Sequence, residues 1–370
     1  MRSSAGQQTL PRYLEIGRIL RERVQCGEIP VGEKLAGERQ LARDFGVSPV
    51  TMSRALAELA REGIVVRVPG DGTYVRSEGD GRGSSDMTAR HLYEILVDTS
   101  PIGQPMANYY MGTVMSGLQE AVVQHGCFVR FLRPGAPGAR LRLEPKPRQG
   151  LLVLAPLAER GGEVAEMARR IPLVVCGARW PGVQVPTVDS DNVEAASQVV
   201  EYLLRLGHRD IALVCSPPIR TNSVDRLDGY RRALLCNGVQ PREELIVHSA
   251  FQYEMGSGAA AQLDALMRST GAPTALFATD YSLALESMAR LRALGLHIPN
   301  DVSVVGFDDS LSAPYLSPPL TTVQQPLQQM GRRAAEMLLD LIEGGGHACP
   351  VAVCSCTLVV RGSCRSTRHD

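Results

Sequence analysis

Carboxylates, a tryptophan and small polar residues follow several short apolar runs in this 370-residue sequence. These positions are Asp98-Thr99-Ser100, Pro156, the segment 177–180 that ends in Trp180, Ser216, Thr279-Asp280 and Asp308-Asp309. If the runs are parallel strands, their carboxyl ends meet at one edge of a sheet, where open α/β folds bind ligands. Arg226, near the start of an expected helix, adds a guanidinium fork. Carboxylates and such a fork pair with neighbouring hydroxyls, so these residues predict a pocket for a sugar-like molecule.

Each of these side chains also has a purely structural explanation. Arg226 could form a surface salt bridge with a neighbouring aspartate, and Asp308 could cap the following segment. Asp280 could N-cap the helix that it precedes, and Trp180 could anchor a packed loop. Asp280 and Asp308 could also form the carboxylate pair of a glycosidase, but no nucleophile–base pattern or phosphate-binding loop accompanies them. We therefore expect a binding protein without a cofactor, and not an enzyme.

The elements that would hold this pocket alternate between strands and helices. Apolar runs lie at 93–97, 128–132, 151–155, 173–176, 211–215, 275–278 and 302–306, and helices are expected at 108–125, 192–206, 224–237, 256–269, 281–294 and 326–343. This alternation predicts parallel sheets covered by helices on both faces. About 280 residues exceed the needs of one such sheet, so two lobes are expected. Residues 133–150, rich in Pro, Gly and Arg, predict an irregular connection.

Residues 38–75 predict a second kind of site. Ser48 is a good N-cap, and Pro49 suits the first position of a helix. Met52, Ala55, Leu56 and Leu59 would be the buried residues of this helix, while Val50, Thr51 and Arg54 would lie on its other side, near its start. Two short strands with a Pro-Gly-Asp-Gly tip follow, and this order is typical of a winged helix-turn-helix that reads DNA. The alternative is a small helical core with a solvated hairpin.

Charge adds little support for DNA binding. The net charge is +0, so no global field attracts nucleic acid. The arginines that could still gather on one side of the first domain are Arg39, Arg43, Arg54, Arg67 and Arg76. We therefore expect geometry, and not a basic surface, to decide DNA binding.

The segment 11–75, PRYLEIGRILRERVQCGEIPVGEKLAGERQLARDFGVSPVTMSRALAELAREGIVVRVPGDGTYV, resembles the DNA-binding domain of the GntR family. The resemblance implies that Arg39 contacts phosphate or a base. The positions that it assigns to the recognition helix and the wing are Ser48, Val50, Thr51, Ser53, Gly70 and Gly72. Pro49 stands where that family usually has a DNA-contacting Arg, so the operator is expected to differ.

Three later segments, HRDIALVCSPPIRTNSVDRLDGYRRAL, PTALFATDYSLALESMARLRALGLHIPNDVSVVGFDD and LTTVQQPLQQMGRRAAEMLLDLI, resemble the effector domain of the LacI/GalR family. The resemblance implies a two-lobed, periplasmic-binding-protein-like fold, homodimers, and ligand contacts from Arg226, Asp308 and Asn222. Asp280 stands where that family usually has Asn. Gly177 replaces a usual Asp, which implies a different ligand.

We expect three regions: a winged helix-turn-helix domain at 1–76, a flexible linker at 77–91, and a two-lobed effector-binding and dimerisation domain at 92–364. The N-terminus has no apolar core, no run reaches membrane-spanning length, and nine scattered cysteines suit a reducing cytoplasm without a metal site. The predicted function is a sugar-responsive, DNA-binding transcriptional repressor. The alternative is a sugar-binding protein for solute uptake.

Overall fold

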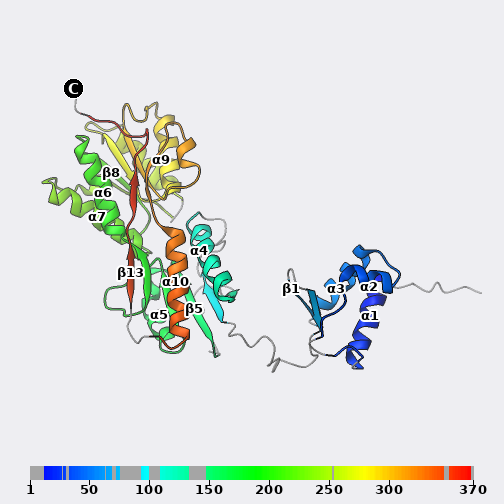
Figure 1. The fold of residues 1–370 in the computed structure, drawn as a ribbon. Coiled ribbons are helices and arrows are strands. Elements are labelled where there is room, and N and C mark those ends of the chain that lie inside the picture. Colours follow the sequence, from blue (N-terminus) through cyan, green and yellow to red (C-terminus); the bar gives the residue numbers. More distant parts are fainter. Residues whose placement is uncertain are drawn as a thin grey trace, which may run out of the picture. The chain divides into compact units, whose positions relative to one another are not determined.

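The computed structural model describes residues 12–26, 28–30, 33–62, 64–68, 72–75, 93–99, 109–132, 147–251, 254–345 and 350–367 (Figure 1). The chain divides into two compact units, Met1–Arg90 and His91–Asp370. The predicted fold class, a winged helix-turn-helix followed by a two-lobed α/β domain with parallel sheets, is confirmed. The expected linker 77–91, most of 133–150, Gly70, Arg76 and Ser100 lie outside the described residues. None of the helices in the described ranges is long and apolar enough to cross a membrane.

The first unit is a small helical core with a hairpin. Its elements are α1 (Arg12–Gln25), α2 (Glu38–Asp44), α3 (Pro49–Arg61), β1 (Val65–Val68) and β2 (Gly72–Val75), the two strands being antiparallel. Gly46, at a φ of 62°, provides the left-handed residue between α2 and α3. The predicted apolar side of α3 is buried against α1 and β1, with Met52, Leu56 and Leu59 each no more than 1% exposed. This core fixes which side of α3 faces outward.

Two six-stranded sheets build the two lobes of the second unit, counted over the described residues. In the first lobe the strand order is β13 (Val351–Cys354), β7 (Thr187–Ser190), β6 (Leu173–Cys176), β5 (Gln149–Leu154), β3 (Glu94–Asp98) and β4 (Phe128–Phe131). In the second lobe it is β14 (Thr357–Val359), β12 (Thr321–Gln324), β11 (Ser303–Phe307), β10 (Ala275–Ala278), β8 (Ile211–Cys215) and β9 (Ile246–His248). Neighbouring strands are parallel except the pair β12–β14.

Helices cover both faces of each sheet. The first lobe has α4 (Tyr109–His125) and α10 (Leu327–Ile342) packed on one face and α5 (Gly161–Ala168) on the other (Figure 1). In the second lobe, α6 (Asn192–Arg205) and α7 (Thr221–Cys236) pack on one face, and α8 (Gly256–Met267) and α9 (Tyr281–Ala293) on the other. The sequence predicted all of these helices except α5, and its seven apolar runs do not include the short strands β7, β9, β12, β13 and β14.

Helices α4 and α10 touch through their backbones. A Cβ atom added to Gly117 would lie 1.8 Å from the carbonyl oxygen of Gln328, and one added to Gly331 would lie 1.9 Å from that of Val114. Only glycine permits this approach. The two helices therefore form one closely packed layer of the first lobe.

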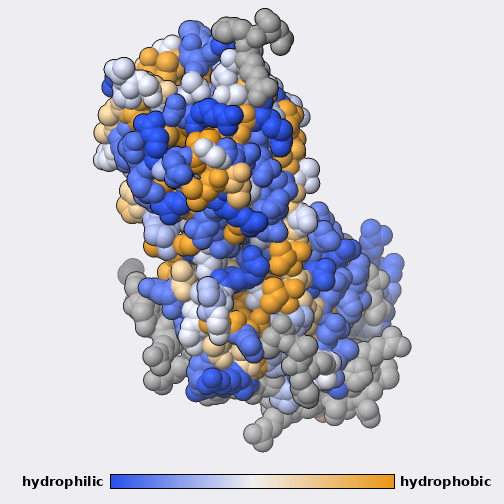
Figure 2. Space-filling view, turned by 90° about the vertical axis from the view of Figure 1, so that its left-hand side faces the viewer, coloured by the Kyte–Doolittle hydropathy of each residue, from blue (hydrophilic) through white to orange (hydrophobic). Residues whose placement is uncertain are grey.

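The described part of the chain passes between the lobes three times. The passages run from β7 into α6, from β12 into α10, and from β13 into β14. They bring the carboxyl ends of β3, β5 and β6 opposite those of β8, β10 and β11. Viewed from the side that carries α6 and α7, hydrophobic residues are exposed at the waist between the lobes and over the second lobe (Figure 2).

Candidate functional site

A small cavity lies where the strand ends of the two lobes meet. We call it the interlobe cavity, and the residues that line it are Tyr110, Ala155, Ser216, Asn222, Ser223, Arg226, Asp280 and Asp308. It holds about 20 Å³ of accessible space, enough for about one water molecule. A sugar needs far more room, so the lobes must part, or these side chains must move, before one can enter.

Arg226 lines the interlobe cavity and is held in place by contacts with three residues. It is 5% exposed, its Nε donates to Asn192 Oδ1 at 2.9 Å, and its Nη1 donates to the Thr279 carbonyl oxygen at 2.6 Å. Its guanidinium lies 3.6 Å from the centroid of the Phe307 ring. Among the described residues no ion pair joins it to Asp225 or Asp228, so the surface salt bridge is not what the structure contains. Two hydrogen bonds and a stacked ring fix the direction of the fork.

Asp280 both caps a helix and lines the cavity. Its Oδ1 accepts from the Leu283 N–H at 2.9 Å at the start of α9, and its Oδ2 accepts from Ser216 Oγ at 3.3 Å. The capping explanation is therefore right, yet the carboxyl also belongs to the cavity wall. Burial raises the pKa of Asp280 to about 7; the hydrogen bond from the Leu283 N–H opposes this shift, and the charge of Asp308 adds to it.

Asp308 follows β11 in a left-handed backbone conformation, with a φ of 72°. Asp tolerates this conformation better than most residues, and it directs the carboxyl into the cavity. Gln325 Nε2 donates to Asp308 Oδ1, and Ser190 Oγ donates to Gln325 Oε1. Burial raises the pKa of Asp308, although nearby Arg226 opposes this shift. These hydrogen bonds join the cavity to two of the passages between the lobes.

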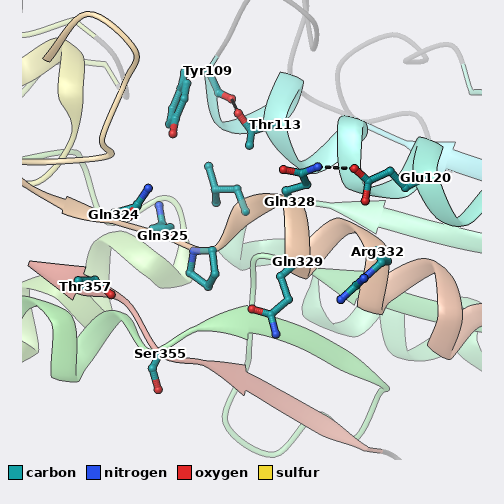
Figure 3. A pocket seen from close by; sticks show the side chains of 12 residues that line it. Tyr109, Thr113, Glu120, Gln324, Gln325, Gln328, Gln329, Arg332, Ser355 and Thr357 are labelled. Atoms are coloured by element: carbon teal, nitrogen blue, oxygen red, sulfur yellow. Dashed lines mark hydrogen bonds between the residues drawn. The ribbon is translucent and has the colours of Figure 1, made fainter. Parts of the chain in front are cut away.

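A larger hollow of about 620 Å³ lies beside those passages (Figure 3). Its walls come from α4, from the start of α10 and from the segments around the ends of β12 and β13, and Gln328 of α10 donates to Glu120 of α4 on one side of it. Of the residues predicted to bind the effector, none is in its lining. Gln325, which bonds to Asp308, contributes to its wall, so its shape depends on the passages.

The structure separates the remaining predicted effector residues. Asn222 lines the interlobe cavity from the first turn of α7. Trp180 does not line it: its indole N–H donates to the Ala158 carbonyl oxygen at 2.7 Å, and its ring packs against Gly161. The structure therefore favours the packed-loop explanation for Trp180. A bulky aromatic in a loop gives no sequence signal that tells stacking on a ligand from stacking on backbone.

Tyr110, Ala155 and Ser223 were missed by sequence reasoning. Ala155 is the last residue of an apolar run and Ser223 lies in the first turn of a helix, positions that the strand-end rule reaches within a residue or two. Tyr110 sits in the first turn of α4, and its hydroxyl occupies the space beside Gly177. A Cβ atom at Gly177 would lie 2.1 Å from that hydroxyl oxygen, and the φ of Gly177 is 85°. The absence of a side chain at 177 thus has a packing reason.

The predicted DNA-binding residues fall into free and engaged groups. Arg39 is exposed and, among the described residues, has no hydrogen bond or ion pair. Ser48 caps α3 by accepting from the Thr51 N–H at 3.2 Å. Arg54 lies over the Tyr13 ring, 5.6 Å from its centroid. The arginines therefore do not form one free basic surface.

The hairpin is tied to the recognition helix. Arg67 Nη2, from β1, donates to the Ser53 carbonyl oxygen at 2.8 Å and lies 3.5 Å from Ser53 Oγ. Gly72 begins β2, where a Cβ atom would press on the Lys34 side chain. The Arg67 contact fixes the hairpin relative to α3. It occupies Nη2 of Arg67 within the domain and leaves the other N–H donors of the guanidinium for DNA.

Comparisons with known proteins agree with this architecture. Residues 12–75 match the bacterial regulatory proteins of the gntR family, and residues 200–364 match a periplasmic binding protein-like domain. The chain is 29% identical over 353 residues to the arabinose metabolism transcriptional repressor of Geobacillus stearothermophilus, spanning 91% of this chain and 93% of the relative. It is 33% identical over 221 residues to the HTH-type transcriptional repressor CytR of Escherichia coli (strain K12), spanning 60% of this chain and 64% of CytR.

Among solved structures, the transcriptional regulator CelR in complex with cellobiose is similar, with a TM-score of 0.64 and 27% identity over 86% of this chain and 91% of CelR. These similar proteins are regulators of transcription, which confirms the expectation of a regulator and not an enzyme. No group of three or more metal-ligating side chains that could hold a metal occurs in the described ranges. The chain thus combines a helix-turn-helix domain with a periplasmic-binding-protein-like domain.

Proposed function

We propose that this protein is a DNA-binding transcriptional repressor whose operator binding is controlled by a small sugar-like effector in the interlobe cavity. The observation that carries the proposal is the buried cluster of Arg226, Asp280 and Asp308 at the meeting edges of two lobes, in a chain that also has a winged helix-turn-helix. Arg226 supplies a fixed donor fork, and the two carboxyls can accept hydrogen bonds or, when protonated, donate them. Adjacent sugar hydroxyls offer the complementary pattern.

The names of two similar proteins support a sugar-like effector. One relative carries arabinose metabolism in its name, and the similar CelR structure contains cellobiose. The burial of the cluster gives a reason for selectivity, because a ligand that leaves one of these groups without a partner would bind much more weakly.

Effector control follows from linkage. A ligand that binds one arrangement of the lobes more tightly than another shifts the population toward that arrangement, by no more than this difference in affinity. The three passages bend together when the lobes move, and Gln325 joins them to Asp308. We expect ligand binding to release the protein from DNA; the opposite coupling, in which the ligand strengthens DNA binding, would rest on the same linkage.

This mechanism calls for a homodimer, because two helix-turn-helix domains must match two half-sites along the duplex. The loop after β11 exposes large apolar side chains that a second copy would cover: Leu311 is 85% exposed and Tyr315 is 87% exposed. Analytical ultracentrifugation of the full chain tests this, and a monomer at micromolar concentration would contradict it. A regulator that binds operator DNA would act in the cytoplasm.

Fluorescence anisotropy separates the regulator from a solute-binding protein. Labelled duplexes from an in vitro selection, and inverted repeats upstream of the protein's own gene, are titrated with the full chain at several salt concentrations. A regulator binds one palindromic duplex tightly, and its affinity falls steeply with salt. Monosaccharides and disaccharides that raise the melting temperature of the protein are then added to the complex of protein and duplex. Equal, weak binding to all duplexes would favour solute binding.

A further inference from the structure

Among the described residues, three of the four exposed side chains on the outward face of α3 are apolar. The residues exposed there are Pro49, Val50, Arg54 and Ala57. Val50 is the most prominent of the apolar ones, because 75% of its surface is exposed. A single exposed valine on a protein surface is ordinary and needs no ligand. Its position makes this one informative.

Val50 is the second residue of a helix whose first turn is the part that reaches base edges in a helix-turn-helix complex. The Ser48 cap fixes this turn, and the Ser48 and Thr51 hydroxyls are hydrogen bonded to each other at 2.8 Å. The buried side of α3 is locked into the core. Rotation of the helix cannot therefore exchange Val50 for another residue.

Two of the predicted DNA-binding arginines, Arg54 and Arg67, are engaged within the domain. Arg54 stacks on Tyr13, and Arg67 holds the Ser53 carbonyl oxygen. Pro49, which precedes Val50, has no polar side chain. Within the first turn of α3 the exposed side chains are those of Pro49 and Val50, and Val50 presents an isopropyl group to the surroundings.

The major groove has one apolar feature at its base edges, the C5-methyl group of thymine. Opposite the other bases, an isopropyl group would displace water from donors or acceptors without replacing the lost hydrogen bonds. We infer that Val50 reads a thymine in each half-site through contact with its C5-methyl group. This inference rests on the proposed operator binding, and it names a base at one position of that operator. It further implies that 5-methylcytosine, which has the same methyl group, fits the contact better than cytosine.

The test removes the methyl group and nothing else. Duplexes are first selected from a random library with the full-length protein. Each thymine of the selected half-site is then replaced in turn by deoxyuridine, and affinities are measured by anisotropy. At one position we expect the wild-type protein to bind about fourfold more weakly, which corresponds to about 0.8 kcal/mol for one buried methyl-sized group.

Variants assign the effect to the side chain. Val50→Ala should bind the thymine duplex more weakly and no longer distinguish it from the uracil duplex, while Val50→Thr, which keeps one methyl group, should retain part of the preference. The matched control is Val66→Ala, because Val66 is 45% exposed but lies on β1. Its preference for thymine should stay as in the wild type. Circular dichroism confirms that each variant is folded.

Two results would overturn the inference while leaving operator binding intact. One is equal affinity for every thymine and uracil duplex, and the other is a thymine preference that survives in Val50→Ala. If no duplex is enriched in the selection, the proposed function fails, and the inference fails with it.

Discussion

Replacement of Asp280 by Asn tests whether burial in the interlobe cavity governs the charge of this carboxyl. Asn can keep the helix cap, because its Oδ1 can accept from the Leu283 N–H, and its Nδ2 can donate to Ser216 Oγ. The variant therefore removes the ionisation and leaves the local hydrogen bonds in place. The unfolded chain loses the Asp280 proton near the ordinary aspartate pKa of 3.8, whereas burial raises the folded-state pKa to about 7.

The sign follows from proton uptake. Between these two pKa values the folded state holds a proton that the unfolded state has lost, so the stability contribution of Asp280 is greatest below pH 3.8 and falls as the pH rises through about 7. The resulting cost to folding is about 2 kcal/mol at pH 5 and about 4 kcal/mol at pH 8.5. Since Asn has no such cost, the advantage of Asp280→Asn over the wild type should grow by about 2–3 kcal/mol between these pH values.

Urea unfolding at pH 5 and at pH 8.5, followed by far-ultraviolet circular dichroism, measures this difference. Asp264→Asn is the matched control, because the hydrogen bond from Arg290 lowers the pKa of Asp264 and its carboxylate lies near the surface. This control should lose stability at both pH values, since both lie above the lowered pKa. An advantage of Asp280→Asn that is the same at pH 5 and pH 8.5 would refute the reasoning.

Three further predictions concern the cavity, the head and the helix pair. Asp308 is replaced by Asn, because Ala would be strained at a φ of 72°. Asp308→Asn should weaken the effector response at least about tenfold in the anisotropy assay and leave operator affinity unchanged. A normal response would show that Asp308 does not belong to the effector site. Arg39→Ala should weaken operator binding and, if Arg39 contacts phosphate, make the slope of log K against log salt shallower by about one unit; an unchanged affinity would contradict both roles. Gly331→Ala should lower the free energy of unfolding by about 3 kcal/mol, because its Cβ atom would lie 1.9 Å from the Val114 carbonyl oxygen. The control Gly258→Ala, whose Cβ atom would have no atom within 4 Å, should be neutral or slightly stabilising. Similar midpoints of urea unfolding for the two variants would contradict the close contact.

Much of the fold was predictable because long helices and buried parallel strands have clear periodicities. The expected helix at 281–294 matches α9, and the run 173–176 matches β6. Helix α5 was missed because its sequence, GGEVAEMA, opens with two glycines and is only 8 residues long. Strand β9 was missed because it has only three residues, and β12 was missed because its sequence, TTVQ, contains a single apolar residue and does not form an apolar run.

The candidate site was predictable in part, because strand ends in parallel sheets meet at one edge. Asp280 and Asp308 come just after strands β10 and β11. Arg226 lies in α7, the helix that follows β8 and begins at the same edge of the sheet. Trp180 could not be placed, since its partner in the structure is a backbone carbonyl in a loop. The engagement of Arg54 and Arg67 could not be predicted either, because it depends on the packing of α1 and β1 against α3.

The three passages between the lobes also determine how the chain can be shortened. Helix α10 and strand β13, which complete the first lobe, come after the strands β8, β10, β11 and β12 of the second lobe in the sequence. A fragment that stops before residue 327 would leave the buried side of α4 exposed to water, and a fragment that starts at residue 192 would carry α10 and β13 without the sheet that they belong to. No single cut in the polypeptide therefore releases one intact lobe, and the synthesis of the first lobe is complete only after most strands of the second lobe have been made.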